Sequence, residues 1–171
     1  IGQVKLLDSD SEFRLATAIE ASRLVNAFHR HPLRKGVSLA SSIYHSIVLE
    51  LSTSWERLSE DADRLHHDTP DLGLMLTEAQ ALRAGWISDA PSYLRAFLDN
   101  GKWGIDPIWD DFARKSYSVY LSLYLLPFNY AAWLLGLINQ KHQLPILRTM
   151  YGHLPDDKEL LEELEVVKIR S

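Results

Sequence analysis

The spacing of apolar residues predicts that the chain is helical along most of its length. From Ser38 onward, apolar residues recur every three or four positions, which is the period of an amphipathic helix. These residues are Leu39, Ile43, Ile47, Leu51, Trp55, Leu58, Ala62 and Leu65. Ser9 followed by Glu12 forms a capping box, which predicts an earlier helix that runs to about His31. We find no strand-like alternation longer than a few residues.

Helix start signals divide the middle of the chain. Thr69 as N-cap and Pro70 as the first helical residue predict the start of a third helix. Residues 88–98 carry the pattern of a short helix. Asp106 followed by Pro107 is a second cap with proline at the first helical position, and it predicts a longer helix.

The run from Ser116 to Gln140 contains no Asp, Glu, Lys or Arg and is the strongest feature of the sequence. It has the length of a membrane span, which needs about 20 apolar residues. Pro127 and Asn129 lie near its centre, however, and its hydroxyl and amide groups need hydrogen-bond partners that lipid does not provide. Basic residues flank both ends, so no charge asymmetry orients a span. We therefore expect a central helical hairpin, bent at Pro127 and buried in a soluble domain.

Two further helices are expected near the end of the chain. Residues 145–151 predict a short turn of helix, and residues 156–167 predict a last amphipathic helix. Its inward face is expected to hold Leu160, Leu161 and Leu164. Together the patterns predict an all-α fold, with residues 1–171 forming one domain. The domain is expected to be a compact bundle of about seven to eight helices around the buried hairpin.

Composition narrows the classes of function. A chain of 171 residues with 46% hydrophobic and 24% charged residues is one globular domain by the usual length rule. It has no cysteine, which excludes disulfides, thiolate metal sites and cysteine nucleophiles and favours a reducing, cytoplasmic location. The net charge of −5 argues against a general nucleic-acid binder, because phosphate recognition depends on Lys and Arg. The basic cluster at residues 29–35 is interpreted as a helix end with its loop.

One histidine-rich segment suggests metal chemistry. In Leu65-His66-His67-Asp68, adjacent His and Asp side chains can hold one divalent ion. The segment resembles the signature of the HD-domain metal phosphohydrolases, which are all-α proteins whose bound metal activates water. The resemblance implies His67 and Asp68 as the central pair, with the remaining ligands drawn from His31 or His45 and from Asp106, Asp110 or Asp111.

A simpler interpretation of this segment needs no metal. Histidines at a helix terminus complement the negative end of the helix dipole, and Asp68 favours the turn that follows. We favour this interpretation and expect no cofactor. The phosphohydrolase with a divalent metal stays as the alternative.

Aromatic density is the remaining clue, since the chain has 5 Trp and 7 Tyr. Both residue types favour interfaces and ligand pockets, because each joins a large apolar body to one hydrogen-bonding group. The candidates for an interface or a ligand pocket are Trp103, Trp109, Tyr117, Tyr120 and Tyr124. A small-molecule pocket between the central helices, lined by the three tyrosines, is a further hypothesis.

We find no nucleophile within a catalytic sequence motif, no phosphate-binding loop and no HExxH motif. The leading hypothesis is therefore a non-enzymatic helical module that binds a protein partner or a second copy of itself, without nucleic acid or membrane. Inhibitors, adaptors and toxin-neutralising proteins include small acidic helical proteins of this kind.

Overall fold

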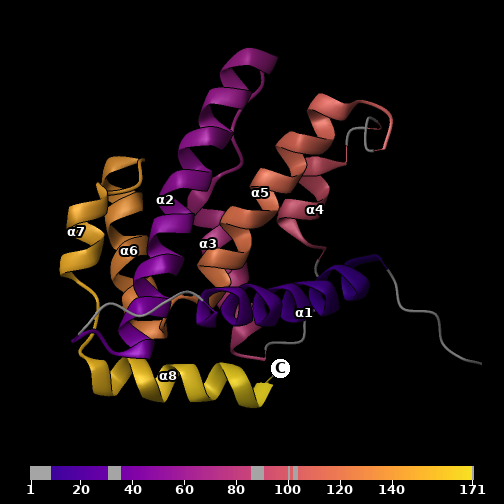
Figure 1. The fold of residues 1–171 in the computed structure, drawn as a ribbon. Helices are drawn as coiled ribbons and strands as arrows, with labels where there is room; N and C mark the ends of the chain where they lie inside the picture. Colours follow the sequence, from indigo (N-terminus) through magenta and orange to yellow (C-terminus); the bar gives the residue numbers. More distant parts are fainter. Residues whose placement is uncertain (1–8, 31–35, 86–90, 100, 102–103, 171) are drawn as a thin grey trace, which may run out of the picture.

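The computed structural model describes residues 9–30, 36–85, 91–99, 101 and 104–170, and in this part of the chain every regular element is a helix. This confirms the all-α class and the expected number of helices (Figure 1). The helices are α1 (Ser9–His29), α2 (Leu39–Leu65), α3 (Leu72–Arg83), α4 (Tyr93–Leu98), α5 (Pro107–Leu125), α6 (Phe128–Lys141), α7 (Leu147–Gly152) and α8 (Asp157–Arg170).

Helix α2 packs against four other helices of the bundle, and its buried residues follow the predicted spacing. Ser38 caps it, since the Ser38 hydroxyl oxygen accepts the Ser41 N–H at 3.1 Å. Its apolar stripe is buried at Ile43, Ile47, Leu51, Leu58 and Ala62. The stripe packs most extensively on α5, while α1, α7 and α8 cover its other sides. Figure 1 shows α2 running from the bottom of the bundle to its top, with α8 lying across the lower end.

The charge-free run forms two helices that meet at Pro127, as the sequence predicts. Leu126 takes an extended conformation, φ −64° and ψ 140°, because proline disfavours helical geometry in the residue before it. Helix α5 packs on α2 and α3, whereas α6 packs on α3, so α3 is the neighbour that the two helices share. Among the described residues, no helix combines the length and the apolarity that crossing a membrane requires.

Side chains from α3 satisfy the carbonyl groups that the Pro127 break leaves open. Gln80 Nε2 donates to the Leu123 carbonyl at 2.7 Å and to the Leu126 carbonyl at 3.0 Å. Arg83 Nη1 donates to the same Leu126 carbonyl, and Arg83 Nη2 pairs with the Glu163 carboxylate of α8. Arg83 is only 7% exposed, so one buried cation joins α3, α5 and α8.

Two local expectations are wrong. Helix α3 begins at Leu72 and its N-cap is Asp71, not Thr69, because the Asp71 carboxylate accepts the Leu74 N–H at 3.0 Å. Pro70 is buried just outside the helix. In α8, Leu160 and Leu164 face the core as expected, but Leu161 is 53% exposed. Successive helical residues point about 100° apart. When Leu160 and Leu164, four positions apart, both face the core, Leu161 therefore points away from it.

Candidate functional site

A hollow lies where α2 ends and α5 begins, at the upper ends of these helices in Figure 1. This cleft has a volume of about 370 Å³. Asp61, Arg64 and Leu65 line it from α2, and Pro107, Ile108 and Asp111 line it from α5. Ile108 is 61% exposed, and Ile105, just before α5, is 79% exposed. We call the hollow lined by these six residues the α2–α5 cleft.

A series of ion pairs links the charged residues that line the α2–α5 cleft. Asp61 is only 7% exposed, and its carboxylate is matched by Arg64 at 3.4 Å and by Lys115 of α5. Lys115 also pairs with Asp111 at 2.9 Å, and Arg64 lies 3.9 Å from Glu60. Hydrogen bonds from Lys115 to the two carboxylates raise the pKa of its ammonium group. The buried Asp61 charge is thus compensated, and it holds the two helix ends together.

The first turns of α5 add further negative charge. Asp106 caps the helix, and its carboxylate accepts the Ile108 N–H at 3.0 Å. Asp110 accepts the Gly104 N–H at 2.8 Å, which fixes the backbone just before the helix. Both carboxylates stabilise the positive end of the helix dipole, so their place at the start of α5 has a local structural reason.

Aromatic side chains from α4 and from the residues after α2 pack against the start of α5. Trp109 is 2% exposed, stacks on Phe112 at a centroid distance of 5.0 Å, and donates from Nε1 to the Leu98 carbonyl of α4 at 3.2 Å. The His67 ring meets Trp109 edge-on at 5.1 Å and Phe97 at 5.5 Å. The interface candidate Trp109 therefore joins α4 to α5 inside the core and presents almost no surface to a partner.

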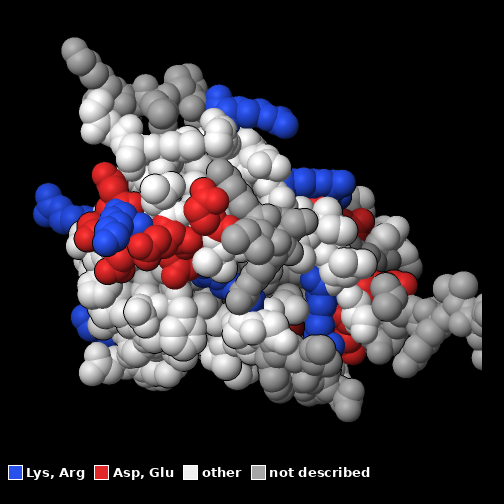
Figure 2. All heavy atoms as spheres, turned by 90° about the horizontal axis from the view of Figure 1, so that it is seen from below, with Lys and Arg blue, Asp and Glu red and all other residues white. Residues whose placement is uncertain are grey.

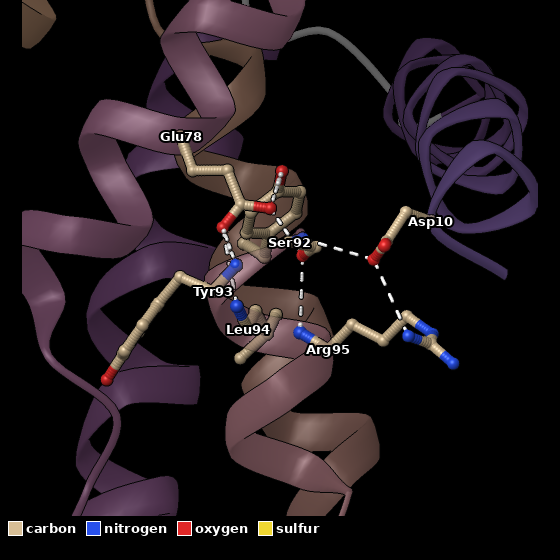
Figure 3. A network of polar contacts seen from close by, with 7 residues as sticks. Asp10, Glu78, Ser92, Tyr93, Leu94 and Arg95 are labelled. Carbon is tan, nitrogen blue, oxygen red and sulfur yellow. Dashed lines mark hydrogen bonds and ion pairs between the residues drawn. The ribbon is translucent and has the colours of Figure 1, made fainter. Parts of the chain in front are cut away.

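A carboxylate that the sequence analysis did not single out fixes α4 in this place (Figure 3). Glu78 of α3 accepts the Ser92 hydroxyl, the Tyr93 N–H at 2.9 Å and the Leu94 N–H at 3.3 Å. Asp10 of α1 accepts the Ser92 N–H at 3.1 Å. These contacts join residues far apart in the sequence, and Glu78 carries no local motif that would reveal them.

The described residues of the metal alternative are not brought together as the resemblance implies. His45 lies near the start of α2, where its Nδ1 is 2.7 Å from the Ser41 carbonyl oxygen. His67 follows the end of the same helix, about 30 Å away at 1.5 Å per residue, and its Nδ1 is 2.8 Å from the Asp68 carbonyl oxygen. Asp111 pairs with Lys115, and His31 lies outside the described residues. In the described ranges, no three His, Asp or Glu side chains are grouped so as to hold one metal ion.

The tyrosine candidates are packed rather than arranged around a pocket. The rings of Tyr117 and Tyr120 stack at 6.5 Å, and Phe13 of α1 lies 5.6 Å and 5.3 Å from them. The cavity beside Tyr124 measures about 10 Å³, which is room for about one water molecule. That cavity therefore has no space for a larger ligand. Trp103, the last candidate, lies outside the described residues.

Three buried tyrosines predict that the protein loses stability in alkali. Burial raises the pKa of Tyr44, Tyr120 and Tyr130 above the ordinary value of 10.0. Above pH 10 the unfolded chain therefore releases protons that the folded chain retains, so the free energy of unfolding falls as pH rises. We expect the urea midpoint to be constant from pH 8 to pH 9 and to fall progressively above about pH 10. Tyrosinate absorbance recorded with the denaturation curves checks this, and ionisation of all seven tyrosines before any unfolding would contradict it.

Comparisons with protein-family models, with curated proteins and with solved structures find no match to this chain.

Proposed function

We propose that this chain is a non-enzymatic interaction module that binds a protein partner through the α2–α5 cleft. The observation that carries the proposal is Ile108, which lines a hollow of about 370 Å³ and is 61% exposed. Ile105 is the most exposed large apolar side chain among those described. Exposed apolar groups gathered at a concave place are typical of docking sites, whereas single ones occur on any surface.

The energetics favour a macromolecular occupant. Full burial of an isoleucine side chain contributes about 1.5–3 kcal/mol, so covering Ile108 would supply part of a micromolar affinity, and a macromolecular partner would add contacts around it. The cleft also stands on a rigid base, since α2 and α5 make the most extensive helix contact in the structure and Asp61 links them through Lys115. A preorganised site loses little conformational entropy when its partner binds.

A site-specific crosslinking experiment tests the proposal. A photoreactive benzophenone residue replaces Ile108 in one variant and Leu74 in another, since Leu74 of α3 is similarly exposed at 50%. Both are irradiated in an extract of the cells that produce the chain. We expect discrete adducts from position 108 and none from position 74, because a partner seated in the cleft covers only the first position.

Competition distinguishes specific adducts from random ones. Excess unmodified chain should abolish the adducts, whereas excess Ile108→Glu chain should not, because a carboxylate in the cleft opposes apolar contact. An adduct with twice the mass of the 19.6 kDa chain would identify a second copy as the partner. Equal labelling from both positions, or no adduct at position 108, would show that the cleft is not a docking site.

A further inference from the structure

The exposed face of α6 carries no charge until the last residue of the helix. Its exposed residues before Lys141 are Phe128, Asn129, Ala132, Gly136, Asn139 and Gln140. Helices α1, α2, α5, α7 and α8 each expose at least one charged side chain, and examples are Glu12, Glu56, Asp111, Arg148 and Glu162. On a chain with a net charge of −5, the exposed face of α6 is therefore a neutral surface.

Three exposed residues of this face form a ridge, which we call the α6 ridge. Phe128, Ala132 and Gly136 are four positions apart, so they follow one another along one side of the helix. Phe128 is 65% exposed. Apart from the chain neighbours of Gly136 and the helix backbone, no atom lies within 4 Å of the place that a Cβ would take at Gly136. The α6 ridge thus has a large side chain at one end and open space at the other, at equal distances from Ala132.

We infer that the α6 ridge is the contact surface of a twofold homodimer. An interface of this symmetry uses the same patch of both copies. When α6 of one copy crosses α6 of the other antiparallel, with the twofold axis at Ala132, each Phe128 ring lies against Gly136 of the other copy. Ridges of residues four positions apart interdigitate in the commonest class of helix crossing. This contact is separate from the α2–α5 cleft and goes beyond the proposed function.

Charge favours a second copy at α6 over other faces of the molecule. Seen from below, acidic side chains gather over α8 (Figure 2), and two such faces would repel each other. The α6 ridge contains no carboxylate. The antiparallel arrangement also separates Lys141 of one copy from Lys141 of the other by about 27 Å along the helices, at about 1.5 Å per residue. Two copies of an acidic chain can therefore meet at α6 without opposing like charges on this helix.

Sedimentation velocity of the intact chain over a range of concentrations tests the inference. A single pair of crossing helices buries less surface than a standard interface, so we expect a weak dimer. The 19.6 kDa monomer should dominate at about 2 µM and the dimer at about 400 µM. Phe128→Glu should raise the dimer dissociation constant at least about a hundredfold, because each dimer loses two buried rings.

The Phe128→Glu variant should keep its fold. Phe128 is exposed and lies in the first turn of α6, where a carboxylate complements the helix dipole. Leu15→Glu is the matched control, since Leu15 of α1 is similarly exposed at 53% and the variant changes the net charge by the same amount. Its dissociation constant should stay within about twofold of that of the wild type.

Gly136→Leu separates a fitted contact from general apolar attraction. Leucine is a better helix former than glycine and the space above Gly136 is open, so the melting temperature of the monomer should not fall. The leucine side chain would occupy the place of the opposing Phe128 ring, so the dimer should weaken at least about tenfold. General apolar attraction would instead make association stronger, and that result would overturn the inference.

Single cysteines test the register of the two helices. The chain has no cysteine, so an introduced one can form a disulfide only with its copy in another chain. Ala132→Cys lies at the twofold axis and should give a disulfide-linked dimer on mild oxidation. Gln140→Cys is the control, because the two copies of this exposed position lie about 24 Å apart along the helices, far beyond the limit of about 7 Å between Cα atoms.

Three other results would also overturn the inference. One is a monomer at every concentration. Another is a dimer that Phe128→Glu does not weaken, or equal disulfide yields at positions 132 and 140. The third is a dimer that is lost in Ile108→Glu and kept in Phe128→Glu, which would place the second copy in the α2–α5 cleft. The first two results leave the proposed function of that cleft unchanged, because the α6 ridge contains none of its lining residues.

Discussion

Leu123→Asp is expected to unfold the protein. Leu123 is fully buried in α5, a helix that packs on α2 and α3. A carboxylate at this position would be a buried charge without a matching cation, and burying an unpaired charge costs several kcal/mol. The whole free energy of unfolding of a domain is about 5–15 kcal/mol, so one such cost removes most of it. Circular dichroism and urea denaturation of the variant measure the loss.

A charge-matched variant on the same helix serves as the control for Leu123→Asp. Ile108→Asp adds the same carboxylate at a position that is 61% exposed and lies in the first turn of α5, where negative charge complements the helix dipole. Its urea midpoint should stay close to that of the wild type. Equal midpoints for Leu123→Asp and the wild type would mean that the charge-free run is not the core of the fold.

Arg83→Met is expected to lower the free energy of unfolding by about 3 kcal/mol. Methionine keeps most of the apolar volume but removes the guanidinium group. The Leu126 carbonyl then loses one donor, and the Glu163 carboxylate loses its cation. The Leu126 carbonyl keeps its hydrogen bond from Gln80, whereas the partly buried Glu163 carboxylate, whose side chain is 31% exposed, is left without its cation, and this is the main source of the cost. Denaturant melts of the variant give its size.

A double-mutant cycle with Glu163→Gln separates the two effects. If Arg83 acts mainly through Glu163, the double variant should cost much less than the sum of the single ones. If it acts mainly through the Leu126 carbonyl, the costs should add. The exposed pair of Arg23 and Glu20, 2.6 Å apart, is the comparison, since Arg23→Met at a surface ion pair should cost less than about 1 kcal/mol. An equal cost at both positions would refute a special role for Arg83.

The sequence predicted only part of the site. The start of a helix depends on local signals, whereas the side of the helix that is buried depends on tertiary packing. Asp106 and Pro107 mark a helix start through local chemistry, so the beginning of α5 was predicted correctly. The aromatic signal made Trp109 a candidate for an interface or a ligand pocket, but its side chain is 2% exposed and faces inward. Ile108, next to it, is the exposed one. A helix that is apolar on most sides gives no periodic signal about which side faces solvent, so the sequence offered no basis for preferring Ile108.

By itself the sequence determined the features that depend on neighbours within about one helical turn. The buried stripe of α2, the Ser38 cap and the break at Pro127 all follow from residues at most four positions apart, and the structure reproduces them. The tertiary structure alone decided the contacts across the bundle. Arg83 reaches Glu163 over 80 positions and Lys115 reaches Asp61 over 54 positions. Such pairs depend on how whole helices pack, and helix packing is set by shape and buried area summed over many residues, which no local pattern records.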